Sequence, residues 1–359
     1  MRLPLLAAAG FLSLLLSGCA CSPCGARTSC AAPCVAPSPA GQSSAAAETK
    51  PGTILDHRSG SAVAFDAMIE RLATASIVYV GEQHDQAQHH AFQARVLFAL
   101  VDRWSADSNP TRPIALGLEM FQKPSQPALD AYAKGEIDEK TMLEKTEWAT
   151  RWGYGWEMYA PMLRLCREKH LSIVALNAPK EITRTVSRKG LDGLTPEQRA
   201  SLPPLDLSDA GHRAFVKEAF GAHGASMPAD TFERFYTAQV IWEETMSSSV
   251  AEWLLANGPS AHMVVVAGDG HIADRFGVPA RAAKKSQRPY LTVVSLVVAP
   301  DDGKPHPAEP SLRRDVRYAD YTAYFAPSAP AAPPKPSAPK SPPTPAAPVP
   351  PAKDAVPPK

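Results

Sequence analysis

Short apolar runs alternate with longer segments of helical spacing along the middle of the chain. Four runs of mainly β-branched and aliphatic residues, 77–80, 114–118, 172–176 and 263–267, predict buried strands. Because segments with helical spacing separate these runs, the pattern predicts crossover units and a parallel sheet. The run 291–298 predicts a further strand, whose direction the pattern does not give. We therefore expect an α/β fold, in which a mostly parallel central sheet is flanked by helices and carries a helical insert or lid.

Two of the intervening segments have a clear helical period. In residues 88–105 the apolar positions recur at helical spacing, and in residues 230–256 an apolar stripe does the same. Gln239 is the polar exception in the second stripe. Because burying an unpaired amide costs free energy, this side chain is either paired within the fold or faces a pocket. The region of about 180–256 is interrupted by glycines and prolines, and it predicts the helical insert.

The start of the chain has the composition of an export signal. Residues 1–18 combine a basic start with an apolar stretch that is too short for a membrane span. Residues 16–19, Leu-Ser-Gly-Cys, match the bacterial lipobox, which predicts acylation of Cys19 and a membrane anchor made of lipid. Because Ala20 follows the cysteine, we expect the protein at the outer membrane of a bacterial envelope.

Both flanks of the remaining chain are predicted to lack a core. Residues 19–52 form a Pro- and Ser-rich tether with four further cysteines, Cys21, Cys24, Cys30 and Cys34. For an exported chain we expect disulfides or free thiols there rather than a metal site. Residues 327–359 are mostly Pro, Ala, Ser and Lys, which predicts an extended, disordered tail. The folded α/β domain is therefore expected in 53–326, and the net charge of +1 gives no field that would attract nucleic acid.

Polar side chains follow the predicted strands at their carboxyl ends: Glu82, His84 and Asp85, then Glu119, then Asn177, then Asp269 and His271. Because parallel strands end at one edge of a sheet, we expect these side chains to meet in a crevice there. His89, near the start of the next helix, is expected to face the same edge. We expect Gly81 to let the chain turn sharply after its strand. Gly268 and Gly270 are expected to form the tight turn that presents His271.

The usual signatures of nucleotide binding and of nucleophilic catalysis are missing. The Gly-x-Gly at 268–270 lacks the third glycine and the later acidic residue of a dinucleotide site. The sequence contains neither a Gly-x-Ser-x-Gly elbow nor a His-Glu-x-x-His zinc motif. The polar cluster is thus expected to bind a ligand or to perform acid–base chemistry.

Six separated segments together resemble the ChaN-like haem-binding lipoproteins. They are Val-Gly-Glu-Gln-His-Asp at 80–85, Leu-Glu-Met-Phe at 118–121, Trp-Glu-Met-Tyr-Ala-Pro at 156–161, Asn-Ala-Pro at 177–179, Gln-x-x-Trp-Glu-x-x-Met at 239–246 and Ala-Gly-Asp-Gly-His at 267–271. The resemblance covers about residues 55–300. It implies a fold shared with Tiki-type metallopeptidases and erythromycin esterases, haem binding linked to iron uptake, and homodimers that enclose the ligand. Glu243 and Asp269 stand where close relatives are expected to have Asp and Asn, and Asp269 adds a charge near the pocket.

The first functional hypothesis is a carrier or store of haem, with a haem receptor or transporter as a further partner. Haem needs an apolar slot, an axial ligand and polar partners for its propionates. The candidate iron ligands are Tyr159, Tyr154 and His271, while His84 and His89 are further imidazoles that ligate iron or hydrogen-bond a tyrosinate. No metal beyond the haem iron is assigned. The apolar wall of the pocket is expected from Trp156, Trp242 and Met246.

The alternative hypothesis is a hydrolase, either an esterase or a metal-dependent peptidase. Glu82, Glu119 and His271 have the chemistry to act as general acid and base on a bound water. Together with His84 or His89 they offer ligands for a divalent metal. A third hypothesis keeps the fold without a ligand, as an envelope scaffold. Of the three, the sequence favours the carrier over an enzyme.

Overall fold

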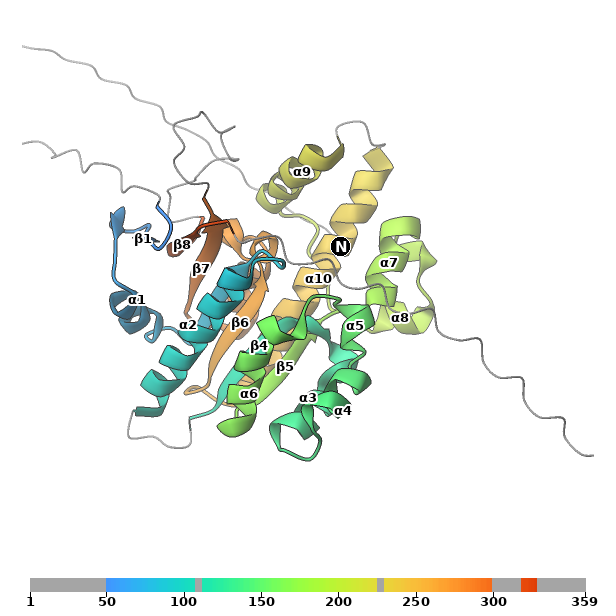
Figure 1. The fold of residues 1–359 in the computed structure, drawn as a ribbon. Helices are drawn as coiled ribbons and strands as arrows, with labels where there is room; N and C mark the ends of the chain where they lie inside the picture. Colours follow the sequence, from blue (N-terminus) through green and yellow to red (C-terminus); the bar gives the residue numbers. More distant parts are fainter. Residues whose placement is uncertain (1–49, 107–111, 225–228, 299–317, 328–359) are drawn as a thin grey trace, which may run out of the picture. The chain divides into compact units, whose positions relative to one another are not determined.

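The structure is a computed structural model that describes residues 50–106, 112–224, 229–298 and 318–327. These residues belong to one compact unit, Ala45–Lys359. The expected signal, Cys19, nearly all of the tether and nearly all of the Pro-rich tail lie outside the described residues. Figure 1 shows the described elements, coloured along the sequence.

The core of the unit is a sheet of eight strands in the order β2-β1-β8-β7-β3-β6-β4-β5. The six strands from β8 to β5 run parallel, and β1 and β2 are antiparallel additions at one edge. The strands are β1 Ile54–Asp56, β2 Ser61–Ala62, β3 Ile77–Glu82, β4 Ile114–Gln122, β5 Ser172–Asn177, β6 His262–Gly268, β7 Tyr290–Val297 and β8 Tyr321–Phe325.

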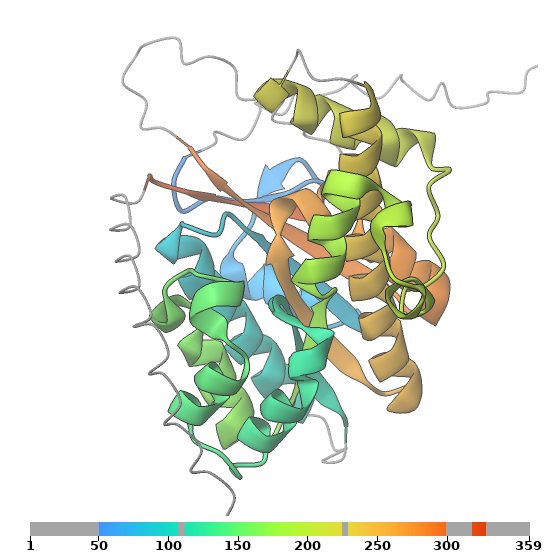
Figure 2. The same ribbon diagram turned by 90° about the vertical axis from the view of Figure 1, so that its right-hand side faces the viewer.

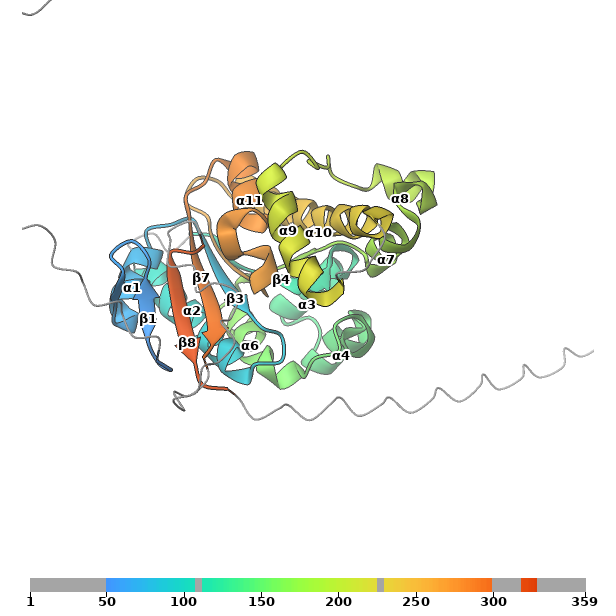
Figure 3. The same cartoon turned by 90° about the horizontal axis from the view of Figure 1, so that it is seen from above.

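Helices cover both faces of this sheet, as the view in Figure 3 shows. One face carries α1 Phe65–Leu72, α2 Ala87–Ala106, α3 Gln126–Ala133, α4 Glu139–Lys145, α5 Trp148–Arg151 and α6 Ala160–Glu168. The other face carries α10 Ala229–Ala256 and α11 Val278–Ser286, with the insert helices α7 Lys180–Lys189, α8 Pro196–Ala200 and α9 Ala210–Gly224 beside α10 (Figure 2).

Alternation along the strands builds a separate core on each face. Val78 and Val80 pack with α2 and α6 on the first face, whereas Ile77 and Tyr79 pack with α10 and α11 on the second. All of these side chains are buried, which is why the central strands read as continuous apolar runs instead of an alternating pattern. The expected α/β class with a helical insert is confirmed.

Two observed strands extend beyond the predicted ones at their carboxyl ends, next to the site. The strand predicted at 77–80 continues to Glu82, and the one predicted at 114–118 continues to Gln122. Glu82 and Glu119 therefore lie within strands rather than after them. The run near 291–298 forms β7, parallel to β3. The sequence pattern did not predict β1, β2 or β8, which are short or lie at the end of the folded part.

The strand order creates a crevice between β3 and β6. From β3 the chain continues through α2 to β4 on one side, and from β6 it continues through α11 to β7 on the other. Open α/β sheets bind ligands where the direction of the connections between strands reverses in this way, outside the carboxyl ends of the strands. Glu82 is paired with Gly268 at this point of the sheet.

In the part of the chain that the structure describes, none of the helices has the length and apolar composition needed to cross a bilayer.

Candidate functional site

Most of the polar residues predicted at the strand ends lie together above this crevice, whereas Asp85 is exposed and does not line it. The backbone N–H of Gly268 at the end of β6 donates to Glu119 Oε2 over 2.7 Å. Asn177 at the end of β5 donates from Nδ2 to the carbonyl of Glu119 over 3.0 Å. Pairing of β4 with β5 shifts register between Leu118 and Gln122, and Glu119 lies within this irregular stretch.

Glu82 contacts three side chains through its carboxylate. Its Oε1 accepts hydrogen bonds from His84 Nδ1 at 2.8 Å and from the Tyr159 hydroxyl at 3.0 Å. Its Oε2 lies 3.0 Å from His90 Nδ1. Burial alone would raise the pKa of Glu82, but the hydrogen bonds from His84 and His90 lower it to about 2. Glu82 is therefore a buried anion at neutral pH, and three side chains are oriented around it.

His90 belongs to this cluster, although the sequence did not single it out. Its Nε2 lies 3.1 Å from the carbonyl of His84, while its Nδ1 faces Glu82. Burial would lower the pKa of His90, but contact with Glu82 raises it. Because both ring nitrogens face acceptors, the charged form is favoured. The sequence signal that could have identified His90 is its position directly after His89 at the start of a predicted helix.

His271 lies between two carboxylates. Its Nε2 is 3.4 Å from Glu119 Oε1, and its Nδ1 is 3.4 Å from Glu243 Oε1. Burial would lower the pKa of His271, but the charges of Glu119 and then Glu243 raise it to about 10. Gln239 Nε2 lies 3.1 Å from His271 Nδ1 and donates to Glu243 Oε1 over 2.8 Å. The polar exception in the helical stripe is thus both paired and directed at the site.

A buried ionic network continues from Glu243 beneath the site. Its Oε2 lies 3.0 Å from Nε2 of His212 on α9 and 3.6 Å from Nε of Arg281 on α11. Burial would raise the pKa of Glu243, but the hydrogen bonds from His212 and His271 lower it to about 2. Arg281 also contacts Glu244, whose other oxygen contacts Lys285. His212, Arg281, Glu244 and Lys285 were not predicted, because they come from three helices whose docking is not visible in local periodicity.

Two glycines make room for site side chains, and neither adopts the left-handed conformation. A Cβ on Gly268 would lie 2.9 Å from His84 Cε1 and 3.2 Å from its Nε2. A Cβ on Gly81 would lie 1.9 Å from Asp269 Oδ1. The prediction that Gly81 turns the chain was wrong, because this residue continues β3 and is needed for close approach. Burial raises the pKa of the neighbouring Asp269 to about 8, so the carboxyl group is largely protonated at neutral pH.

Two hollows meet at His84 and His271, which line both of them. The first, here called the phenylalanine cavity, has a volume of about 540 Å³ and is walled by Phe215, Val216 and Phe235 from α9 and α10. The second, here called the tryptophan cavity, has a volume of about 330 Å³. Its lining includes Trp152, Trp242, Arg151, Lys180, Glu119 and Asn177.

Several predicted site residues lie elsewhere. Met246 is fully buried in the core between the sheet and α10, and Trp156 lines a different hollow on α4 and α5. His89 is buried and lines neither cavity; its Nδ1 accepts the N–H of Gln83 over 3.0 Å. Burial lowers the pKa of His89 to about 4, so the ring is neutral and holds the loop that carries His84.

The candidate iron ligands differ in access. Tyr159 is fully buried and its hydroxyl donates to Glu82, so it is not presented to a ligand. Both ring nitrogens of His271 contact carboxylates. Tyr154 is 38% exposed, with its ring 5.4 Å from the ring of His84. Among the described residues no group of three or more His, Cys, Asp and Glu side chains is arranged to hold a metal ion.

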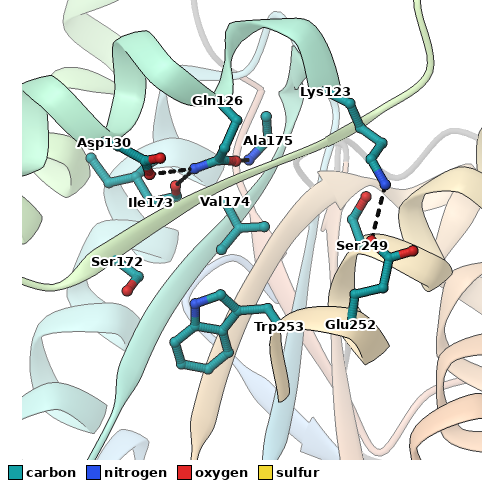
Figure 4. A pocket seen from close by; sticks show the side chains of 10 residues that line it. All are labelled: Lys123, Gln126, Asp130, Ser172, Ile173, Val174, Ala175, Ser249, Glu252 and Trp253. Atoms are coloured by element: carbon teal, nitrogen blue, oxygen red, sulfur yellow. Dashed lines mark hydrogen bonds and ion pairs between the residues drawn. The ribbon is translucent and has the colours of Figure 1, made fainter. Parts of the chain in front are cut away.

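A separate hollow of about 390 Å³ lies along the outer edge of β5, away from this cluster (Figure 4). The side-chain amide of Gln126 donates to the carbonyl of Ile173 over 2.7 Å and accepts the N–H of Ala175 over 2.7 Å. Gln126 thus occupies the place of a neighbouring strand and covers an edge that would otherwise pair with another chain. Figure 4 shows Trp253 across the hollow and Lys123 paired with Glu252. We assign this feature a structural role.

Comparison with known proteins places these observations in a family. A solved structure of ChaN of Campylobacter jejuni, described as showing cofacial haem binding, aligns with a TM-score of 0.57 and 18% identity over 75% of this chain and 95% of that one. An erythromycin esterase structure, EreC in its open conformation, aligns with a TM-score of 0.38 and 13% identity, covering 65% of this chain and 73% of the other.

A curated relative is the chloroplastic protein RETICULATA-RELATED 5 of Arabidopsis thaliana, which is 27% identical over 239 residues. The aligned region is 63% of this chain and about a third (32%) of the length of that protein. A protein-family model described as "Haem-binding uptake, Tiki superfamily, ChaN" matches residues 68–282. This match covers more than half of the chain, and the chain therefore belongs to the ChaN family of haem-binding uptake proteins in the Tiki superfamily.

Proposed function

We propose that this protein binds haem as a carrier or store, and that His84 is the side chain that contacts the iron. The observation that carries the proposal is the pairing of His84 Nδ1 with buried Glu82. A carboxylate on one ring nitrogen fixes the orientation of an imidazole and makes the other nitrogen a better ligand. Within the described chain no other side chain hydrogen-bonds Nε2 of His84. The side chain of His84 is 31% exposed at the junction of the two cavities.

The surroundings of His84 suit a flat, largely apolar ligand with anionic ends. The phenylalanine cavity, at about 540 Å³, falls in the usual range for small-molecule and cofactor pockets. The rings of Trp152 and Tyr154 lie 4.8 and 5.4 Å from that of His84 and offer aromatic surface. Arg151 and Lys180 at the tryptophan cavity supply cationic donors for propionates. When bound, haem would supply an iron for His84 to contact.

The test is a titration of the purified protein with haemin, followed in the Soret region. We expect a shifted Soret band at micromolar haemin, and a loss of that shift in His84→Ala. His170→Asn is the matched control, because His170 is exposed, has a left-handed backbone that Asn tolerates, and lines neither cavity. An unshifted Soret band in the unsubstituted protein would end the proposal of haem binding. A shift that survives in His84→Ala would reassign the ligand, with Tyr154 as the next candidate.

A hydrolase is the second candidate, favoured by the position of Glu119. This carboxylate lines the tryptophan cavity beside His84 and His271, so a carboxylate and two imidazoles face the same space. General acid–base chemistry on a bound water needs such groups within reach of one another. Turnover of ester and peptide libraries, with and without added divalent metal, tests this function. A reaction at this site should be abolished by Glu119→Gln.

We further propose that the protein is a lipoprotein anchored through Cys19 in a bacterial envelope, at the outer membrane. The lipobox at residues 16–19 supports this proposal. Two or three acyl chains suffice for stable membrane attachment. Metabolic labelling with an alkynyl fatty acid should tag the protein. In Cys19→Ser the label should be lost, and the protein should no longer be found in the membrane fraction. Equal labelling of Cys19→Ser would contradict the anchor.

A further inference from the structure

An acidic groove of about 640 Å³ lies on α4, α5 and the short helix η2 Trp156–Met158. It shares no lining residue with the two cavities at His84. Four glutamates and two tryptophans dominate its lining: Glu139, Glu144, Glu147, Glu157, Trp148 and Trp156. A surface that combines aromatic rings with carboxylates is suited to an extended, proline-rich and basic peptide.

The two tryptophans are held in fixed positions. Trp156 donates from Nε1 to Glu139 Oε1 over 2.8 Å, and Trp148 donates from Nε1 to the carbonyl of Tyr154 over 2.9 Å. Their ring centroids are 5.1 Å apart in an edge-to-face arrangement. Trp148 is buried, at 6% exposure, and supports the half-buried ring of Trp156. Because the indole N–H of Trp156 is already paired, this ring can offer its remaining apolar surface to a partner without reorganising. Such a preformed surface reduces the entropy cost of binding.

Each of the four groove carboxylates already has a cationic partner, and Glu147 Oε2 lies 2.7 Å from Arg151 Nε. Arg164 pairs with Glu139 at 2.8 Å and with Glu157 at 3.2 Å. Lys140 is 3.9 Å from Glu144. Even so, the side chains of Glu144 and Glu157 are 66% and 77% exposed. Exposed pairs of this kind are weak, so they leave a negative rim that an incoming lysine can approach.

The chain itself contains a segment of matching chemistry. Residues 330–345, Pro-Ala-Ala-Pro-Pro-Lys-Pro-Ser-Ala-Pro-Lys-Ser-Pro-Pro-Thr-Pro, contain eight prolines, two lysines and no acidic residue. Proline fixes φ near the polyproline II value, and such sequences bind aromatic grooves at a low entropy cost. We propose that residues 330–345 dock in the acidic groove of the same chain, with Lys335 and Lys340 at its glutamate rim.

The end of the described chain lies within reach of the groove. The ring of Phe325 at the end of β8 is 4.9 Å from that of His89 on α2. The neighbouring His90 ring lies 4.4 Å from Tyr159, whose ring lies 5.2 Å from Trp148. The last strand and the groove are therefore separated by only a few side chains on the α2 side of the sheet. Eight residues of polyproline II, from 327 to Lys335, span about 25 Å.

Tethering makes even a weak contact sufficient. A segment joined by a short linker experiences an effective concentration on the order of millimolar. A free peptide with a Kd of about 1 mM would therefore be docked about half of the time when it is part of the chain. We expect isolated peptide 330–345 to bind weakly and the intact chain to show the contact clearly.

Zero-length carbodiimide cross-linking of the full chain at low concentration tests this proposal, because the reagent joins a lysine to a carboxylate in direct contact. Mass spectrometry should find Lys335 or Lys340 joined mainly to Glu144, Glu147 or Glu157. In the double variant Glu144→Lys, Glu157→Lys these cross-links should fall about five- to tenfold, as expected from reversing two exposed charges. Salt at about 1 M should reduce them too, because the Debye length is then about 3 Å.

Glu136→Lys is the matched control, since Glu136 is exposed and precedes Glu139 by three residues but does not line the groove. We expect this variant to keep the cross-links of the unsubstituted chain. An equal loss in Glu136→Lys, or tail cross-links spread evenly over surface glutamates, would overturn the proposal. A mixture of ¹⁵N-labelled and unlabelled chains identifies the pairing: cross-links within one isotope support docking in the same chain, and mixed-isotope cross-links overturn it.

Discussion

Asp269 lies against the backbone of Gly81, where its Oδ1 occupies space that a side chain on β3 would need. A Cβ built on Gly81 would be 1.9 Å from this oxygen. The carboxyl group is buried, and the N–H of Ser295 on β7 donates to it over 3.4 Å. Three neighbouring strand ends are thus packed around one buried acid. Because β3 also carries Glu82, displacement of Asp269 is expected to disturb the site itself.

Gly81→Ala should destabilise the fold. The new methyl group forces Asp269 out of a buried position, and overpacking of this kind costs about 1–3 kcal/mol. Urea unfolding followed by circular dichroism gives the free energy of unfolding. Gly270→Ala is the control, since its Cβ would meet nothing within 4 Å and its φ is not left-handed. Equal stability of Gly81→Ala and the unsubstituted protein would show that the carboxyl group moves aside freely.

Asp269→Asn should remove part of the pH dependence of stability. Burial raises the pKa of this carboxyl group from 3.8 to about 8, so between these values the folded state binds a proton that the unfolded state has lost. The free energy of unfolding therefore falls as the pH rises through this window, by at most about 1.4 kcal/mol per pH unit from this group. In Asp269→Asn the side-chain amide does not titrate, so this residue adds no pH dependence to the free energy of unfolding.

Urea unfolding at pH 5, 6.5 and 8 measures this effect as the difference between the two proteins. Asp269→Asn should gain stability relative to the unsubstituted chain as the pH rises. The asparagine expected in close relatives is then the neutral counterpart of a protonated aspartate. A constant difference at all three pH values would mean that Asp269 is ionised throughout, with a partner for its charge.

Glu119→Gln should lower the pKa of His271. Burial opposes the charge on this imidazole, and Glu119 is the largest of the groups that raise its pKa from 6.5 to about 10. The folded-state pKa is the higher one, so the ion pairs stabilise the fold fully below about pH 6.5, and this contribution is lost as the pH rises through about 10. NMR titration of the His271 ring should show a fall in pKa of at least about one unit, the order of a single strong charge interaction.

Glu119→Gln should also be less stable than the unsubstituted protein at pH 6, and this difference should shrink above pH 10. Glu252→Gln is a suitable control, because Glu252 is an exposed glutamate that lines the hollow at the β5 edge. If the His271 pKa were unchanged in Glu119→Gln, the carboxylate of Glu243 alone would account for the charge.

Sequence reasoning located the strand-end residues because the signal for them is local. Apolar runs mark central strands, and parallel strands bring their carboxyl ends to one edge, so Glu82, Glu119 and Asn177 were expected near one another from chain position alone. The structure brings them together at the β3–β6 crevice. The same local logic explains why the helix around Gln239 was predicted almost to its ends.

The parts that were missed depend on packing between distant segments. His212 reaches Glu243 only because α9 docks on α10, and no periodicity encodes that docking. The reason for Gly81 was misread because a glycine needed for space and a glycine needed for a turn look alike in sequence. Trp156 was assigned to the pocket by its aromatic neighbours, yet it lines the acidic groove on α4 and α5 instead.

Tyr159→Phe separates a structural tyrosine from an iron ligand. The Tyr159 hydroxyl donates to Glu82 in a fully buried position, and burial followed by the Glu82 charge raises its pKa, so tyrosinate is disfavoured. Removing a hydrogen bond to a charged group costs about 1.5–3 kcal/mol, and urea unfolding should show a loss of that order. The Soret shift with haemin should be retained. Tyr154→Phe, at an exposed ring beside His84, should leave stability nearly unchanged. A folded Tyr159→Phe protein without a Soret shift would contradict the proposed role of His84 and return the ligand to Tyr159.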